Sequence, residues 1–291
     1  MIEAFGDFLS AYSSLIALVG VNALLALSVW LTLYAGQLTL GNAAFMAVGA
    51  YVSALLGMRL GVPFPLALAI GAVAAAALAA PLGATVFRLR GVYLAIATLA
   101  FGEVVRVILL ATPITGKGQG LNGIPPKTEL WHVYLSVVVI AYVLWRLQGS
   151  TVGRAWAAIR EDEIAAASQG IAIQRYKLAA FVAGALIAGW AGGLSAHLNF
   201  SIEPNDFSFS KAVQILVFAV VGGIPSPLGP IFGAALLTAL PEILRALKDY
   251  RDIFAGVFLL LVIIYLPRGL VTLAEIRKTR RLEKIGAADV A

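Results

Sequence analysis

The stretch STVGRAWAAIREDEIAAASQGIAIQRYK, residues 150–177, is the longest charged region that lies between apolar segments of this chain. The apolar run 132–148 precedes it and the apolar run 176–198 follows it. An apolar α-helix rises about 1.5 Å per residue, so roughly 20 residues cross the hydrocarbon core of a bilayer. The flanking runs have about that length, which predicts two membrane-spanning helices joined by a polar connector.

Apolar segments of similar length fill most of the remaining chain, which has 291 residues. Lipid offers no hydrogen-bond partners to backbone N–H and C=O groups, so spans this apolar must be helical. Their hydrophobicity does not alternate with a period of two, as the strands of a membrane barrel would. The pattern predicts an all-α integral membrane protein, a polytopic helical bundle of about nine spans (8–10) that forms a single domain, residues 1–291. The expected spans are 13–35, 42–58, 64–87, 92–112, 132–148, 176–198, 208–224, 229–247 and 252–267.

The composition agrees with a surface that faces lipid. Hydrophobic residues make up 61% of the chain and charged residues only 12%, against about 25% in an average soluble domain. There is no cysteine, which excludes disulfides and thiolate metal sites, and two histidines, His132 and His197, cannot build a histidine-rich metal site. Residues 1–12 contain no Lys or Arg, whereas a secretory signal begins with a positive region, so the first apolar segment is expected to stay as a span.

The distribution of Lys and Arg predicts the orientation of the spans, because cytoplasmic loops carry an excess of both. This asymmetry explains the net charge of +6 better than binding of nucleic acid does. If the loop at 148–175 is cytoplasmic, that side receives Arg88, Arg90, Arg146, Arg154, Arg160, Arg175, Lys177, Arg268, Arg277, Lys278, Arg280, Arg281 and Lys284. The other side receives Arg59, Lys117, Lys127, Lys211, Lys248 and Arg251. With nine spans, the N-terminus lies outside, and the C-terminus lies inside with its basic tail of about 268–291.

The polar connector itself is expected to contain a short helix along the membrane surface. Its middle is rich in alanine, which favours helix, and it presents charges of both signs. Gly170 suits the position just after the helix, where a left-handed conformation ends it. The residues alone leave two interpretations open, a solvated connecting helix and a surface on which a partner docks.

A resemblance to a known family favours the second interpretation. The run AIREDEIAAASQGI, residues 158–171, resembles the cytoplasmic coupling segment of ABC importer permeases, in particular the branched-chain amino acid permeases of the LivM type. Gln169, Pro225 and Pro227 depart from the residues expected in that family. Further matching motifs, in the same order as in the family, are GQLTLGNAAF (36–45) with GAY (49–51), RLRGVYLAIATLAFGE (88–103), TG (115–116) through GIP (123–125), VVGG (220–223), GP (229–230) and LPRGL (266–270).

The resemblance covers about residues 20 to 270 and implies the permease subunit of an ABC importer for branched-chain or other hydrophobic amino acids, in the bacterial cytoplasmic membrane. It implies four kinds of partner: a second homologous permease subunit, two ATP-binding subunits, an external substrate-binding protein and the lipid bilayer. The sequence has no GxxxxGK[ST] pattern, so we expect no ATPase or other enzymatic activity in this chain, and no cofactor. The coupling segment, about 150–172, would dock the ATP-binding subunits through Arg154, Arg160, Glu161, Asp162, Glu163 and Gly170.

Polar residues within the spans are candidates for the translocation path. Glu103 and Arg106 are three apart and share a helix face, with Glu103 about 16 Å into its span. A charge at that depth is costly and usually faces a cavity or a partner, although a self-neutralising pair that holds helices together is the alternative. Asn22, Gln37 and Asn42 are further candidates, with interhelical hydrogen bonding as the competing interpretation.

Other functions fit the sequence less well. A permease for urea, amides or other amino acids is not distinguished by any motif. An ion-coupled secondary transporter would need buried carboxylates, and only Glu103 is central. A membrane-embedded enzyme would need a nucleophile with its base, or a metal cluster, and the residues suggest neither.

Overall fold

The computed structural model describes residues 12–243 and residue 256. Eight of the nine expected spans are helices there, with ends within a few residues of the predicted ones. They are α2 (Ser13–Tyr34), α3 (Asn42–Arg59), α4 (Phe64–Val86), α5 (Val92–Ala111), α6 (Leu130–Gln148), α9 (Ile173–Asn199), α10 (Phe209–Gly222) and α11 (Leu228–Ile243). The last part of the segment 229–247, the segment 252–267 except for residue 256, and the tail 268–291 lie outside the described residues.

Shorter elements connect these helices at both ends of the bundle. The two strands β1 and β2 pair antiparallel, with Leu121 opposite Ile202. The connecting elements are η1 (Pro113–Thr115), η2 (Lys117–Gln119), β1 (Leu121–Asn122), α7 (Thr151–Glu161), α8 (Glu163–Ser168), β2 (Ser201–Ile202) and η3 (Pro204–Phe207).

Five of the described helices, α2, α4, α5, α6 and α9, are long and apolar enough to cross a membrane. This confirms an all-α membrane protein, whereas a count of nine spans is not confirmed. The helix α10 has 14 residues and therefore a length of about 21 Å, less than the roughly 30 Å of a hydrocarbon core. The helix α11 is also shorter than a typical span.

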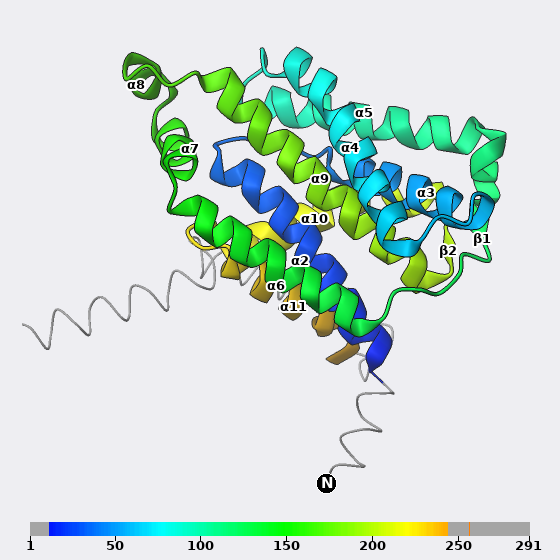
Figure 1. Ribbon diagram of the computed structural model, residues 1–291. Helices are drawn as coiled ribbons and strands as arrows, with labels where there is room; N and C mark the ends of the chain where they lie inside the picture. Colours follow the sequence, from blue (N-terminus) through cyan, green and yellow to red (C-terminus); the bar gives the residue numbers. More distant parts are fainter. Residues whose placement is uncertain (1–11, 244–255, 257–291) are drawn as a thin grey trace, which may run out of the picture.

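The helices run back and forth between two ends of the bundle, which Figure 1 shows at opposite sides of the view. We call them the α7–α8 end and the β1–β2 end. Among residues 12–243, the β1–β2 end contains three Lys or Arg residues, Arg59, Lys117 and Lys127. The α7–α8 end contains seven, namely Arg88, Arg90, Arg146, Arg154, Arg160, Arg175 and Lys177. The charge asymmetry expected from the sequence is therefore present in the described helices.

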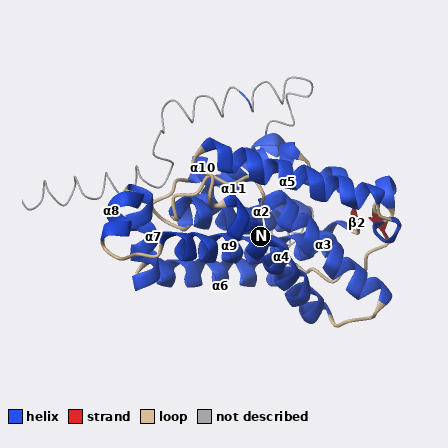
Figure 2. Ribbon diagram, turned by 90° about the horizontal axis from the view of Figure 1, so that it is seen from above, coloured by secondary structure: helices blue, strands red, loops and turns tan. Residues whose placement is uncertain are grey.

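The helix α9 lies at the centre and packs along α2, α3 and α4 (Figures 1 and 2). Glycines allow its backbone to approach its neighbours closely. A Cβ atom at Gly192 would lie 2.0 Å from the carbonyl oxygen of Met46, and one at Gly49 would lie 2.1 Å from that of Gly189. No side chain fits in either place, so these glycines set the separation of α3 and α9.

Between α2 and α3 the backbone is not helical, yet it is buried in protein. The amide of Gln37 donates to the carbonyl of Thr32 at 2.9 Å, and the amide of Leu40 donates to the Thr98 hydroxyl on α5 at 3.0 Å. Asn42, the first residue of α3, donates to the hydroxyl of Ser28 at 2.9 Å. Because Ser28 precedes the end of α2 by six residues, α3 begins about 9 Å inside the bundle.

The contact between α3 and α9 predicts the effect of one added methyl group. Gly192→Ala should force the two helices apart and cost about 1–3 kcal/mol or more, as overpacking does in well-packed cores. The melting temperature of the detergent-solubilised protein should fall and the folded yield with it. Gly102→Ala is the matched control, because its Cβ would come no closer than 4.0 Å to Ala44 and should leave both unchanged. Equal melting temperatures for the two variants would contradict this packing.

Candidate functional site

The helix α7 is anchored to the bundle by its apolar face. Ser150 caps its start by accepting a hydrogen bond from the Gly153 amide at 3.3 Å. Trp156 and Ile159 are buried, and the Trp156 indole N–H donates to the carbonyl of Tyr176 on α9 at 2.8 Å. The helix α7 is therefore held against α9 and is not a freely solvated connector.

The last turn of α7 lies on the junction between α2 and α3. The Arg160 guanidinium lies 5.2 Å from the centroid of the Tyr34 ring, a cation–π contact. A Cβ at Gly36, which has φ +74°, would lie 3.0 Å from the Cα of Arg160. Arg160, expected to face an ATPase, thus also contacts the segment that leads into α3.

The polar connector contains two helices where the sequence predicted one. Asp162 separates them: its backbone is extended, with φ −155° and ψ 112°. Its carboxylate accepts hydrogen bonds from the amides of Ile164 at 2.7 Å and Ala165 at 3.0 Å, so Asp162 serves as the N-cap of α8. The single-helix prediction was wrong because a capping carboxylate outweighed the helix preference of the alanines around it.

The end of α8 agrees with the prediction for Gly170, which has φ +78°. Its amide donates to Ala167 at 3.0 Å, and the amide of Ile171 donates to Ala166 at 3.2 Å. This pair of hydrogen bonds ends a helix at a left-handed glycine and directs the chain back toward α9.

Glu163 is turned toward the bundle and is only partly exposed. It forms an ion pair with Lys177 of α9, whose side chain is 10% exposed, and its other oxygen lies 3.9 Å from the Nε of Arg90, between α4 and α5. Of the residues expected to couple to an ATPase, four are exposed, namely Arg154, Glu161, Asp162 and Gly170. Together with Ile164, which is 77% exposed, they form what we call the α7–α8 surface.

Glu103 and Arg106 form the pair that the sequence suggested. The Arg106 Nε lies 2.8 Å from a Glu103 carboxylate oxygen, and the side chains are 25% and 38% exposed for Arg106 and Glu103. A third partner was not foreseen: an Arg106 Nη donates to the side-chain oxygen of Asn205 in η3 at 3.0 Å. The pair thus ties η3 to α5 and remains partly open to the exterior of the chain.

Lys211 was expected at the outer ends of the spans, and this was wrong. Its Nζ donates to the side-chain oxygens of Asn22 on α2 at 3.3 Å and Gln214 at 3.4 Å. The Asn22 amide in turn donates to the Thr238 hydroxyl on α11 at 3.0 Å. Lys211 precedes the end of α10 by eleven residues, or about 16 Å, which places it near the middle of the bundle.

The depth of Lys211 follows from the path of the chain before it. After β2 the chain enters the bundle, where the Phe207 ring of η3 lies 6.1 Å from that of Tyr51, midway along α3. The helix α10 therefore starts well inside the β1–β2 end. The short length of the apolar run 208–224 was the one sequence signal of this arrangement.

The two amide candidates near the start of α3 differ from each other. Asn42 is buried, donates to Ser28 and lies 3.3 Å from the hydroxyl of Thr39, so it makes the interhelical hydrogen bonds that were its alternative role. Gln37 is 1% exposed, and neither polar atom of its side chain has a hydrogen-bond partner within the described residues. Ala43, the residue after Asn42, lines a small cavity together with Glu103.

The helix α6 lies on one face of the bundle and α5, α10 and α11 lie on the opposite face (Figure 2), and both faces expose apolar side chains. The exposed large side chains of α6 are apolar or aromatic, with the aromatic ones toward its ends, as at a lipid boundary: Trp131, Tyr134, Leu135, Val138, Val139, Tyr142, Val143 and Trp145. A groove of about 470 Å³ between α6 and α9, lined by residues such as Val139 and Trp190, continues this apolar surface. The opposite face carries the Glu103–Arg106 pair at a depth where exposure to lipid is costly.

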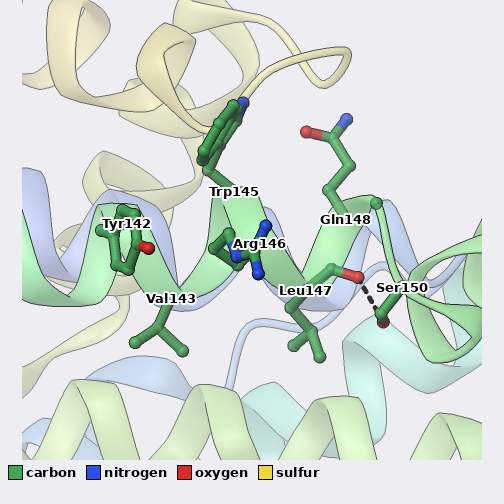
Figure 3. Close-up of a pocket in the computed structure, with 8 residues that line it drawn as sticks. Tyr142, Val143, Trp145, Arg146, Leu147, Gln148 and Ser150 are labelled. Carbon is green, nitrogen blue, oxygen red and sulfur yellow. Dashed lines mark hydrogen bonds between the residues drawn. The ribbon is translucent and has the colours of Figure 1, made fainter.

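A larger hollow of about 820 Å³ lies where α6 meets α7 (Figure 3). Its described lining comes from one continuous stretch, 142–150, with Trp145, Arg146 and Gln148 prominent. The Gln148 amide donates to the carbonyl of Pro225 at 2.6 Å, and this hydrogen bond joins the end of α6 to the turn before α11. A path through a membrane needs walls from several helices, whereas the described walls of this hollow come from the stretch 142–150 alone. We therefore do not assign this hollow to transport.

Comparison with known proteins adds a family match. Residues 11–265 match the family model described as branched-chain amino acid transport system / permease component. The chain is 36% identical over 292 residues to the high-affinity branched-chain amino acid transport system permease protein LivM of Escherichia coli K12, an alignment that covers 88% of this chain and 67% of that protein. No solved structure matches the chain significantly.

More distant relatives are also permease proteins. LivH of Salmonella typhimurium is 29% identical over 154 residues, covering 52% of this chain and 49% of LivH. The autoinducer 2 import system permease protein LsrC of Escherichia coli O9:H4 is 24% identical over 167 residues, covering 51% of this chain and 48% of LsrC.

The ion pair between α8 and α9 predicts a charge-swap result. Glu163→Lys and Lys177→Glu should each release α8, because each leaves a partly buried charge without its partner. Chymotrypsin should then cut the solubilised protein near Trp156 and Tyr176 several-fold faster. The double variant should recover most of the resistance, though not all, because Arg90 would face a lysine.

Glu161→Lys is the matched control for this swap. The Glu161 side chain is 79% exposed and its ion-pair partner, at 3.5 Å, is the adjacent Arg160, so cleavage should stay at the wild-type rate. If Glu163→Lys is as resistant as Glu161→Lys, the pair does not hold α8 in place.

Proposed function

Because the chain belongs to the family of permease components of branched-chain amino acid transport systems, we propose that it is one permease subunit of an ATP-driven importer of branched-chain or other hydrophobic amino acids in a bacterial cytoplasmic membrane. The observation that carries this proposal is the 36% identity to LivM over 88% of the chain. The names of the LivM and LivH relatives favour branched-chain amino acids over urea or amides as the substrate. A second permease chain of the LivH kind is the expected partner.

Separate ATP-binding subunits would dock on the α7–α8 surface. The chain lacks the GxxxxGK[ST] loop that binds nucleotide phosphates, so its energy must come from another subunit. Exposed Arg154, Glu161 and Asp162 offer both charge signs, and exposed Ile164 offers an apolar contact. Because α7 is tied to α9 by Trp156, closure of the ATPases would move the bundle as a rigid body.

The α7–α8 end would face the cytoplasm and the β1–β2 end the exterior. The seven Lys and Arg residues at the α7–α8 end, against three at the other, support this orientation. An external substrate-binding protein would deliver the amino acid to the β1–β2 end. The expected position of the C-terminus, in the cytoplasm, is consistent with the same orientation.

The translocation path would run along the face formed by α5, η3 and α10, between this chain and the second permease. The Glu103–Arg106 pair supports a position of that face away from lipid, because a charge exposed to the bilayer at that depth is costly. The apolar face of α6 on the opposite side is suited to contact the bilayer. Pairing with Arg106 also removes Glu103 as a free carboxylate, which weakens the alternative of an ion-coupled transporter.

The orientation predicts where an introduced thiol reacts. The chain has no cysteine, so Ser168→Cys places a single thiol at the exposed end of α8. A membrane-impermeant maleimide should leave it unlabelled in intact cells and label it in inside-out vesicles. Labelling in intact cells would place the α7–α8 end outside and reject docking of ATPases there.

The docking surface predicts loss of coupling when its charges are reversed. In the reconstituted transporter, Arg154→Glu together with Glu161→Lys should lower ATP-driven uptake of leucine at least tenfold, because both residues are exposed and face the proposed ATPase. Folding should not change, since neither side chain anchors α7 to α9, and the melting temperature checks this. Arg88→Glu, an exposed residue outside the α7–α8 surface, is the control for a general charge effect. Wild-type uptake by the double variant would show that the ATPases dock elsewhere.

A further inference from the structure

We propose that Lys211 binds the carboxylate of the amino acid as it passes the middle of the permease. This inference rests on the proposed function and adds to it a specific site and the chemical group that the site receives. The site comprises the Lys211 ammonium, the first turn of α10, and the side chains of Asn22 and Gln214 that position the ammonium. It was not foreseen from the sequence.

Among the described residues, the ammonium of Lys211 has hydrogen-bond partners but forms no ion pair. Its contacts are the neutral side-chain oxygens of Asn22, at 3.3 Å, and Gln214, at 3.4 Å. An ammonium group has three N–H donors, so two neutral acceptors leave one donor available. Within residues 12–243, no carboxylate lies within 4.0 Å of this nitrogen, and the Asp206 carboxylate of η3 acts on it only from beyond that distance.

A purely structural role does not account for the charge. A neutral donor could join Asn22 to α10 without the cost of placing a cation at mid-depth in a membrane protein, which is high unless the cation is compensated. Arg106, the other cation of this region, is paired with Glu103. A cation that has no ion pair among the described residues is therefore suited to an anion that arrives and leaves.

The start of α10 adds to the positive potential at this position. Lys211 is the third residue of a helix of 14 residues, whose N-cap Ser208 makes no side-chain capping hydrogen bond. The N-terminal turn of a helix carries free N–H groups and a partial positive charge, which normally disfavours a lysine there. Broken helices with such ends inside the bilayer are used by transporters to hold anionic groups of their substrates.

The surroundings suit the rest of an amino acid as well. Phe209, 52% exposed at the same turn, offers apolar surface to an aliphatic side chain. The exposed carboxylate of Asp206, in η3 just before α10, can attract an ammonium group. A zwitterion would thus meet both charge signs, with its carboxylate assigned to Lys211.

The first test measures uptake by the complete transporter in proteoliposomes, with leucine as the probe. Lys211→Met removes the charge at nearly constant length and should reduce ATP-driven uptake at least tenfold, whereas Lys211→Arg should retain most of it. The melting temperature and the assembly of each variant are measured in parallel. Wild-type uptake by Lys211→Met would overturn the assignment. Failure of the unaltered transporter to take up any amino acid would instead overturn the proposed function.

The second test needs no change at Lys211 and so does not depend on how that variant folds. Ser210→Cys places the chain's one thiol beside the site, on the exposed side of α10. An anionic thiosulfonate should modify this introduced thiol about tenfold faster than a cationic one, after correction for their rates with a free thiol, and leucine should slow the reaction.

Val220→Cys is the matched control on the same helix, about 15 Å farther along and therefore beyond the reach of a screened charge. It should show no preference for the anionic reagent. Equal corrected rates for the two reagents with the Ser210→Cys variant would mean that Lys211 presents no positive site to the path and would overturn the proposal.

Discussion

Backbone hydrogen bonding away from water is the constraint on which this structure depends. Long helices satisfy it within themselves, and the two places where helix is absent at depth must satisfy it through protein contacts. One is the segment after α2, where Leu40 bonds to Thr98; the other is the chain around η3, where Arg106 holds Asn205. These interruptions bring polar and charged side chains into a bundle that is otherwise apolar, and the candidate site lies beside them.

The two parts of the candidate site are connected through the first interruption. The last turn of α7 lies on Gly36, at the start of that segment, and Leu40, near its end, is bonded to α5 through Thr98. Glu103 lies five residues farther along the same helix. A displacement of α7 therefore has a direct route of contacts to the face that carries the charge pair, without passing through the glycine-packed centre around α9.

The sequence predicted the apolar helices of the bundle to within a few residues, because the length of an apolar run can be counted along the chain without knowledge of its neighbours. The end of α8 at Gly170 was predictable for a similar reason, since a left-handed cap is a local requirement. Sequence reasoning failed for Lys211 and Glu163, whose positions depend on how deep a loop descends and on which neighbour a side chain meets. Such depths and pairings arise only from tertiary packing.

The division of the polar connector at Asp162 gives its two halves different attachments. The helix α7 is fixed by buried aromatic and aliphatic groups, whereas α8 has six residues and is joined to the bundle mainly by Glu163. Mutations in α8 would therefore alter the proposed docking surface for an ATP-binding subunit and leave the contacts of α7 with the bundle in place. Under the proposed function, related permeases could change the ATP-binding subunit that they bind independently of the amino acid that they transport. Asp162 would then mark the boundary between the segment that recognises the subunit and the rest of the permease.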